Sequence, residues 1–144
     1  MLPADRLDRL SVPWQARRWR ERLTEARAND LVFVAEGPDE VIGYCAGAAP
    51  IGAVPRAEIF TLYLLRKAQG IGLGRALLET TARALSAHGA RSLAIWVLAG
   101  NEHAQGFYEH LGGVRTARRP VWGWGAGLIE FRYDWVDITR LTRT

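Results

Sequence analysis

The feature that most constrains the fold is a run of closely spaced glycines, Gly70, Gly72 and Gly74, between two stretches of opposite character. Before the glycines, residues 57–65 are rich in the apolar and aromatic residues that favour a strand. After them, residues 75–89 carry apolar residues at helical spacing and end on a glycine, which commonly terminates a helix. The chain is therefore expected to pass from a strand through a tight turn into a helix.

A turn of this kind suits an anion. Glycine lets the backbone approach a ligand closely, and the first turn of a helix presents free N–H groups with a partial positive charge. With Arg75 beside it, the turn suits a phosphate or pyrophosphate, although a tight turn without a ligand would contain the same glycines. Two common motifs do not fit: the lysine and Ser/Thr pair of a P-loop is missing, and residues 94–98 lack the acid of a dinucleotide-binding fold.

Patterns elsewhere predict a mixed α/β class. Residues 31–36 and 41–48 indicate two strands joined by a Gly-Pro turn. The other expected elements are a helix over 13–27, a strand over 92–98, a short helix over 101–111 capped by Asn101, and strands over 114–119 and 128–135. Antiparallel strands followed by a strand–helix–strand unit indicate a mixed central sheet flanked by helices.

Composition favours one globular domain spanning residues 1–144, because 49% of the residues are hydrophobic and 24% are charged. The single cysteine, Cys45, excludes an internal disulfide and is expected to be a small core residue. No apolar run approaches the ~20 residues that span a bilayer, and the first residues lack the apolar stretch of a signal peptide. We therefore expect a cytoplasmic protein without membrane contact.

The net charge of +4 does not indicate nucleic-acid binding. The local basic cluster of Arg115, Arg118 and Arg119 has no interleaved aromatic residues, so the charge is expected to attract an anionic small ligand instead. His103 and His110 lie seven residues apart without a third ligand, so a solvated helix face is expected and a metal site is not.

The glycine-rich segment resembles the acetyl-coenzyme A motif of the GNAT-type acyltransferase superfamily. The match is Gln69-x-x-Gly72-x-Gly74, preceded by AEIFTLYLL and followed by RALL. A second segment agrees at the family's spacing, with Asn101, Ala104, Phe107-Tyr108-Glu109 and Leu111-Gly112-Gly113. The resemblance implies a GNAT-like domain, in which the first strand is expected to be short or absent because few residues precede the predicted first helix.

The resemblance also implies where acetyl-CoA, the co-substrate, binds. The pyrophosphate would lie on the backbone amides of the turn, and the pantetheine arm would pair with the main chain at the end of the preceding strand. The implied cofactor-binding residues are Leu62, Tyr63, Leu64, Gln69, Gly70, Ile71, Gly72, Leu73, Gly74, Arg75, Asn101 and Tyr108. One N–H of the strand could also polarise the thioester carbonyl.

The implied reaction is direct attack of a primary amine on the acetyl thioester. Tyr108 resembles the family's general acid, and a core aromatic beside Phe107 is the alternative. Glu58 lies on the strand before the turn, where some family members carry a base. A strand-edge glutamate that faces solvent explains Glu58 equally well.

The acceptor is not identified by the sequence, and a small-molecule, peptide or protein amine all remain open. Trp14, Trp122 and Trp124 could form an aromatic wall of the acceptor site, or could serve packing or a homodimer contact. The leading hypothesis is an acetyl-CoA-dependent N-acetyltransferase. The alternatives are a non-catalytic acyl-CoA-binding or sensing module and a small interaction domain.

Overall fold

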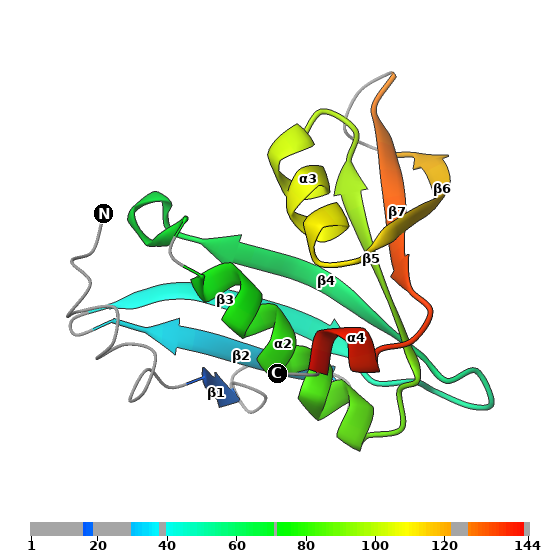
Figure 1. Ribbon diagram of the computed structural model, residues 1–144, viewed down its shortest axis with the longest axis horizontal. Coiled ribbons are helices and arrows are strands. Elements are labelled where there is room, and N and C mark those ends of the chain that lie inside the picture. Colours follow the sequence, from blue (N-terminus) through cyan, green and yellow to red (C-terminus); the bar gives the residue numbers. More distant parts are fainter. Residues whose placement is uncertain (1–15, 19–29, 38–39, 71, 122–126, 143–144) are drawn as a thin grey trace.

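The computed structural model describes residues 16–18, 30–37, 40–70, 72–121 and 127–142, which form a twisted sheet with helices packed against it (Figure 1). The strands are β1 (Ala16–Arg18), β2 (Asp30–Glu36), β3 (Val41–Ala48), β4 (Arg56–Leu64), β5 (Ser92–Leu98), β6 (Val114–Pro120) and β7 (Ile129–Trp135). The helices are α2 (Leu73–Ala87), α3 (Glu102–His110) and α4 (Thr139–Thr142), with a short 3-10 turn η2 (Arg66–Ala68). None of these helices is long and apolar enough to cross a membrane.

The sheet has seven strands in the order β1-β2-β3-β4-β5-β7-β6. Neighbouring strands are antiparallel except β4 and β5, which are parallel and are joined through the glycine turn and α2. The predicted mixed α/β fold is confirmed, and the expected strands agree with the observed ones to within one or two residues. The sequence patterns did not reveal η2 and α4, because each is too short to show a period.

The predicted helix over 13–27 is wrong where the structure can be compared with it. Residues Ala16–Arg18 form β1, which pairs antiparallel with β2, and the rest of the predicted helix lies outside the described residues. The free edge of β2 offers backbone hydrogen bonds to a passing segment, and this pairing prevails over the apolar spacing. The first strand among the described residues, β1, is short, as expected, with three residues.

The core lies between the sheet and α2. The fully buried helix residues Leu77 and Leu85 pack with Leu31 of β2 and Cys45 of β3, so the predicted core position of Cys45 is confirmed. Burying a leucine side chain contributes about 1.5–3 kcal/mol, so this layer holds α2 firmly against one face of the sheet. Gly89 has φ +100 immediately after α2, which is the expected way for the helix to end.

β4 and β5 pair only over half of their length. Their register joins Arg56–Ile59 to Ser92–Ile95, and no β4–β5 pair follows among the described residues. Beyond that point β4 stays with β3 up to Leu64, whereas β5 stays with β7 up to Leu98. A register shift between β3 and β4 marks a bulge at this place, and bulges bend strands. The two strands therefore separate into a wedge, which is visible in Figure 1 as the divergence of β4 from β5.

Candidate active site

The wedge between β4 and β5 opens into a cavity of about 430 Å³. The end of β4, the glycine turn, the start of α2 and one side of α3 all border it. Its lining residues are Leu62, Tyr63, Leu64, Gln69, Gly70, Gly72, Gly74, Arg75, Asn101, His103, Ala104, Phe107 and Tyr108. The two sequence motifs, which are about 30 residues apart in the chain, thus meet at one cavity.

The three glycines of the turn have different roles. Gly70 and Gly72 adopt positive φ values of 78° and 86°, and a Cβ at either would meet no described atom within 4 Å. A Cβ on Gly74 would instead lie 3.1 Å from Leu64 Cδ1 and 3.3 Å from Phe107 Cζ. The first two glycines therefore leave the backbone open to a ligand, whereas Gly74 allows α2 to approach β4 and α3.

The start of α2 presents a positive end to the cavity. Gly72 is the N-cap residue and has no capping side chain, so the first N–H groups of the helix stay available for an anion. Arg75 lies in the first turn, where its exposed guanidinium pairs with Glu79 at 3.0 Å. The Gln69 side chain donates to the carbonyl of Leu64 at 3.3 Å and fixes the turn to the end of β4.

The start of α3 faces the same cavity. The Asn101 side-chain oxygen accepts a hydrogen bond from the Ala104 amide at 3.1 Å, which confirms the predicted helix cap. Asn101 and Tyr108 are seven residues apart and both line the cavity, as the helical spacing predicted.

Tyr108 is both a core residue and a cavity residue. It is 5% exposed, and its ring centroid lies 6.0 Å from the rings of Tyr133 and Trp135. Burial raises the pKa of the Tyr108 phenol, and the neighbouring Cys45 raises it further. The phenol therefore keeps its proton throughout the neutral range and is available as a donor in the cavity.

A buried glutamine that the sequence analysis did not identify holds the end of β5. Gln105 Nε2 donates to the carbonyl oxygens of Leu98 at 3.1 Å and Ala99 at 2.7 Å. Its Oε1 accepts from Arg115 at 3.3 Å. The sequence offered only a weak signal, since Gln105 stands three residues before Tyr108 on the buried side of a short helix.

Glu58 does not line the cavity. It is half-buried in β4, between the core residues Ala57 and Ile59, so its side chain lies on the sheet face opposite α2. In the register of the sheet it stands beside Ala94 of β5, which stands in turn beside Asp134 of β7. Glu58 thus lies on the face of β4 opposite to the cavity residues Leu62 and Leu64, which pack against the core.

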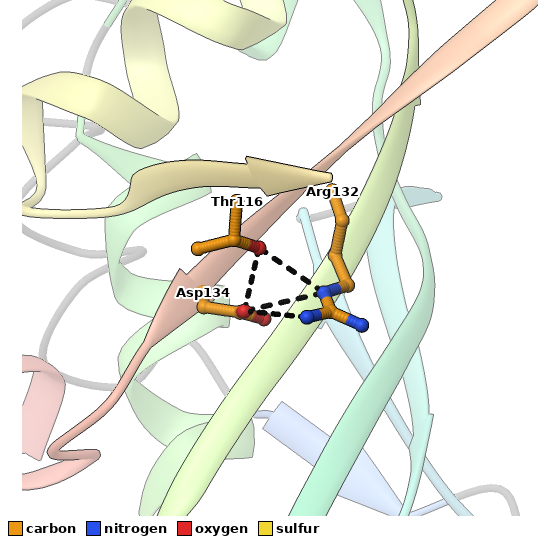
Figure 2. Close-up of polar contacts among 3 residues, drawn as sticks. All are labelled: Thr116, Arg132 and Asp134. Carbon is orange, nitrogen blue, oxygen red and sulfur yellow. Dashed lines mark hydrogen bonds and ion pairs between the residues drawn. The ribbon is translucent and has the colours of Figure 1, made fainter. Parts of the chain in front are cut away.

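A polar cluster lies farther along that face of the sheet (Figure 2). Asp134 Oδ2 accepts from Thr116 Oγ1 at 2.6 Å and pairs with Arg132 Nη2 at 3.1 Å. Asp134 Oδ1 is buried and finds no hydrogen-bond partner in the part of the chain that the structure describes. The cluster joins β6 to β7 on the face away from the cavity.

Four of the predicted site residues cannot be placed. Ile71, Trp14, Trp122 and Trp124 lie outside the described residues. The aromatic wall therefore remains a sequence-based expectation.

The comparison with known proteins agrees with this geometry. The model of the acetyltransferase (GNAT) family matches residues 3–113. The N-acetyltransferase YuaI of Bacillus subtilis, whose activity is uncharacterised, is 29% identical over 144 residues, which is 98% of this chain and 80% of that protein.

Solved structures show the same fold. A Desulfovibrio desulfuricans protein assigned to the GNAT family superposes with a TM-score of 0.70 and 21% identity, covering 82% of this chain and 75% of its own. A Bacillus anthracis protein assigned as a streptothricin acetyltransferase, solved in complex with acetyl-CoA, gives a TM-score of 0.68 and 15% identity, covering 80% and 66%. Because the family model spans well over half of the sequence and the fold agrees, the chain belongs to the GNAT family of acetyltransferases.

Proposed function

We propose that this chain transfers the acetyl group of acetyl-CoA to a primary amine by direct attack in a ternary complex. The observation that carries the proposal is the wedge, in which the edge of β4 at Leu62–Leu64, without a β5 partner in the described part of the chain, lies beside an open glycine turn and a helix start. This combination offers hydrogen bonds to amides and a positive site for phosphates at one cavity.

The cofactor is placed by the backbone. The pantetheine amides pair with the main chain of Leu62, Tyr63 and Leu64 as a further strand would, because β5 leaves that edge free. The pyrophosphate lies on the amides from Gly70 to Arg75, at the positive end of α2. Asn101 reaches the cofactor from α3 on the other side of the cavity.

The chemistry needs an oxyanion donor and an acid. The amine nitrogen attacks the thioester carbonyl, a C–N bond forms, the C–S bond breaks, and the thiolate takes up a proton. An N–H of the open β4 edge stabilises the developing oxyanion. Tyr108 donates to the departing sulfur, since its buried phenol stays protonated and borders the cavity.

The amine approaches from the opposite face of the sheet. Glu58 projects from that face of β4 and acts as the base, through a water molecule, that removes the proton of the amine. Trp14, Trp122 and Trp124 form the aromatic wall of the acceptor site. The acceptor is the amine of a small molecule, a peptide or a protein.

The first test is calorimetric titration of the purified protein with acetyl-CoA, coenzyme A and NADH. Binding of the first two without NADH is expected, and thiol release with a panel of primary amines then measures transfer. A folded protein that does not bind acetyl-CoA would overturn the proposal. Binding without transfer to any amine would instead support a non-catalytic acyl-CoA-binding module.

A further inference from the structure

The cavity contains a titratable side chain that the proposed function does not use. His103 is the second residue of α3 and lines the cavity together with Arg75 of α2. One helical turn later, Phe107 lies close to Gly74 in the first turn of α2. The sequence predicts one solvated helix face for His103 and His110, but only His103 is among the described residues that line the cavity. The two histidines of α3 therefore have different surroundings.

We propose that His103 binds a phosphate group of the cofactor when its imidazole is protonated, so that the affinity for acetyl-CoA increases as the pH falls. The inference rests on the proposed function, because the ligand is the cofactor assigned there. It adds a second cationic side chain to the anion site, from a different helix.

The other charged groups around the cavity are compatible with a contact between protonated His103 and a phosphate. The Arg75 guanidinium on α2 is paired with Glu79, so part of its charge is already compensated. Glu102 adjoins His103 on α3, and the other ionisable groups at the cavity are the phenols of Tyr63 on β4 and Tyr108 on α3. Phenols do not titrate between pH 5 and 8, whereas an imidazole changes its charge in that range.

A protonated imidazole beside a phosphate strengthens binding by an amount typical of an exposed charge pair. Such pairs change an equilibrium by up to about fivefold. The phosphate comes either from the pyrophosphate, which Arg75 and the turn also approach, or from the 3′-phosphate of the adenosine. Dephospho-CoA lacks the 3′-phosphate and separates these two sources.

The experiment compares wild type with His103→Gln, and His110→Gln serves as the matched control on the same helix. Acetyl-CoA is titrated by calorimetry at pH 6 and pH 8, in two buffers of different ionisation enthalpy, so that proton uptake is measured directly. We expect wild type and His110→Gln to bind about three- to fivefold more tightly at pH 6 than His103→Gln does, with uptake of a fraction of a proton. At pH 8 the three proteins should agree.

The comparison between variants removes the ionisation of the cofactor's own phosphate, which is common to all three proteins. Equal affinity and equal proton uptake in wild type and His103→Gln overturn the inference and leave the proposed function intact. Absence of acetyl-CoA binding at both pH values overturns both. A His103→Arg variant, with a permanent charge, should bind about three- to fivefold more tightly than wild type when both are measured at pH 8, and loss of binding in this variant would also count against the assignment.

Discussion

The two halves of β4 belong to one continuous strand and have different surroundings. Over Arg56–Ile59 the strand pairs with β5 on one side, and Glu58 and Ile59 also pair with β3 on the other. Over the second half, which ends at Leu64, it keeps β3 and loses β5, and the cavity takes the place of the missing neighbour. The paired half contains the two charged residues Arg56 and Glu58, and the open half, Phe60–Leu64, contains none. The separation of β5 from β4 therefore creates the space for the candidate site.

The largest expected effect comes from blocking the glycine turn, which follows the open half of β4. Gly72→Val places a branched side chain at φ +86, where L residues are strained, and directs it into the open space beside the turn. We expect the Kd for acetyl-CoA, measured by calorimetry, to rise about 100-fold, which corresponds to about 2.7 kcal/mol.

A matched control for this change lies at the other end of β4. Gly52 in the β3–β4 loop has φ +75 and similar open space, but it is remote from the cavity lining. Gly52→Val should lower the free energy of unfolding by roughly 1–2 kcal/mol, because a branched residue is strained at this φ, and should leave the affinity for acetyl-CoA unchanged. If both variants bind acetyl-CoA as wild type does, the glycine turn is not the phosphate site.

The next effect tests the proton donor. Tyr108→Phe removes the hydroxyl and keeps the ring that packs on Tyr133 and Trp135. We expect kcat to fall by about 50-fold while the KM for acetyl-CoA changes little, because the lost interaction belongs to the transition state. Tyr44→Phe, on a ring outside the cavity lining, controls for loss of a hydroxyl as such. An equal rise in KM with unchanged kcat would assign Tyr108 to binding alone.

A smaller effect is expected from a substitution in the paired half of β4. Glu58→Gln should lower kcat about tenfold and flatten the acidic limb of the pH–rate profile, because the amine then loses its proton without help from the protein. An unchanged pH–rate profile would show that the paired half of β4 has no chemical role. Only the open half of β4 would then contribute to the reaction.

The last effect concerns folding stability, leaves activity at neutral pH unchanged, and appears only at high pH. Burial raises the pKa of the Cys45 thiol, which stands across from Leu62 in the open half, to about 12. The unfolded chain ionises near pH 8.5, so the stabilisation is complete below that pH and is lost as the pH rises toward 12. The free energy of unfolding should therefore fall by up to about 1.4 kcal/mol per pH unit in that window, and less steeply in Cys45→Ala. Denaturant titrations from pH 7 to 11 would detect the difference, and identical slopes would contradict it.

Much of the fold followed from local patterns. The strand before the glycines, the helix after them and the cap at Asn101 are all set by residues within a few positions of each other. The cavity was predictable to the same extent, because the glycine turn that borders it depends on the local backbone conformation of Gly70 and Gly72. The resemblance to a family then joined the two segments into one site.

The remainder depended on distant contacts. The strand over Ala16–Arg18 exists because β2 offers it an edge, and no periodicity within those residues encodes that edge. His103 lines the cavity and His110 does not, and this difference depends on which side of α3 faces α2. The placement of Glu58 away from the cavity needed the register of β3, β4 and β5. Each is a property of pairing between elements, which one sequence does not show.

The hold of Gln105 on the carbonyls of Leu98 and Ala99 has a consequence for how a ligand enters. At the end of β5, beyond its last pair with β4, those carbonyls accept hydrogen bonds from a side chain of the same protein, so they need no ligand as a partner. The end of β5 and the start of α3 are thus held together in the folded chain, and the entropy cost of ordering them is met during folding. A ligand that arrives meets a formed wedge, and the heat capacity change on binding should reflect burial of the ligand's own surface with little ordering of the chain.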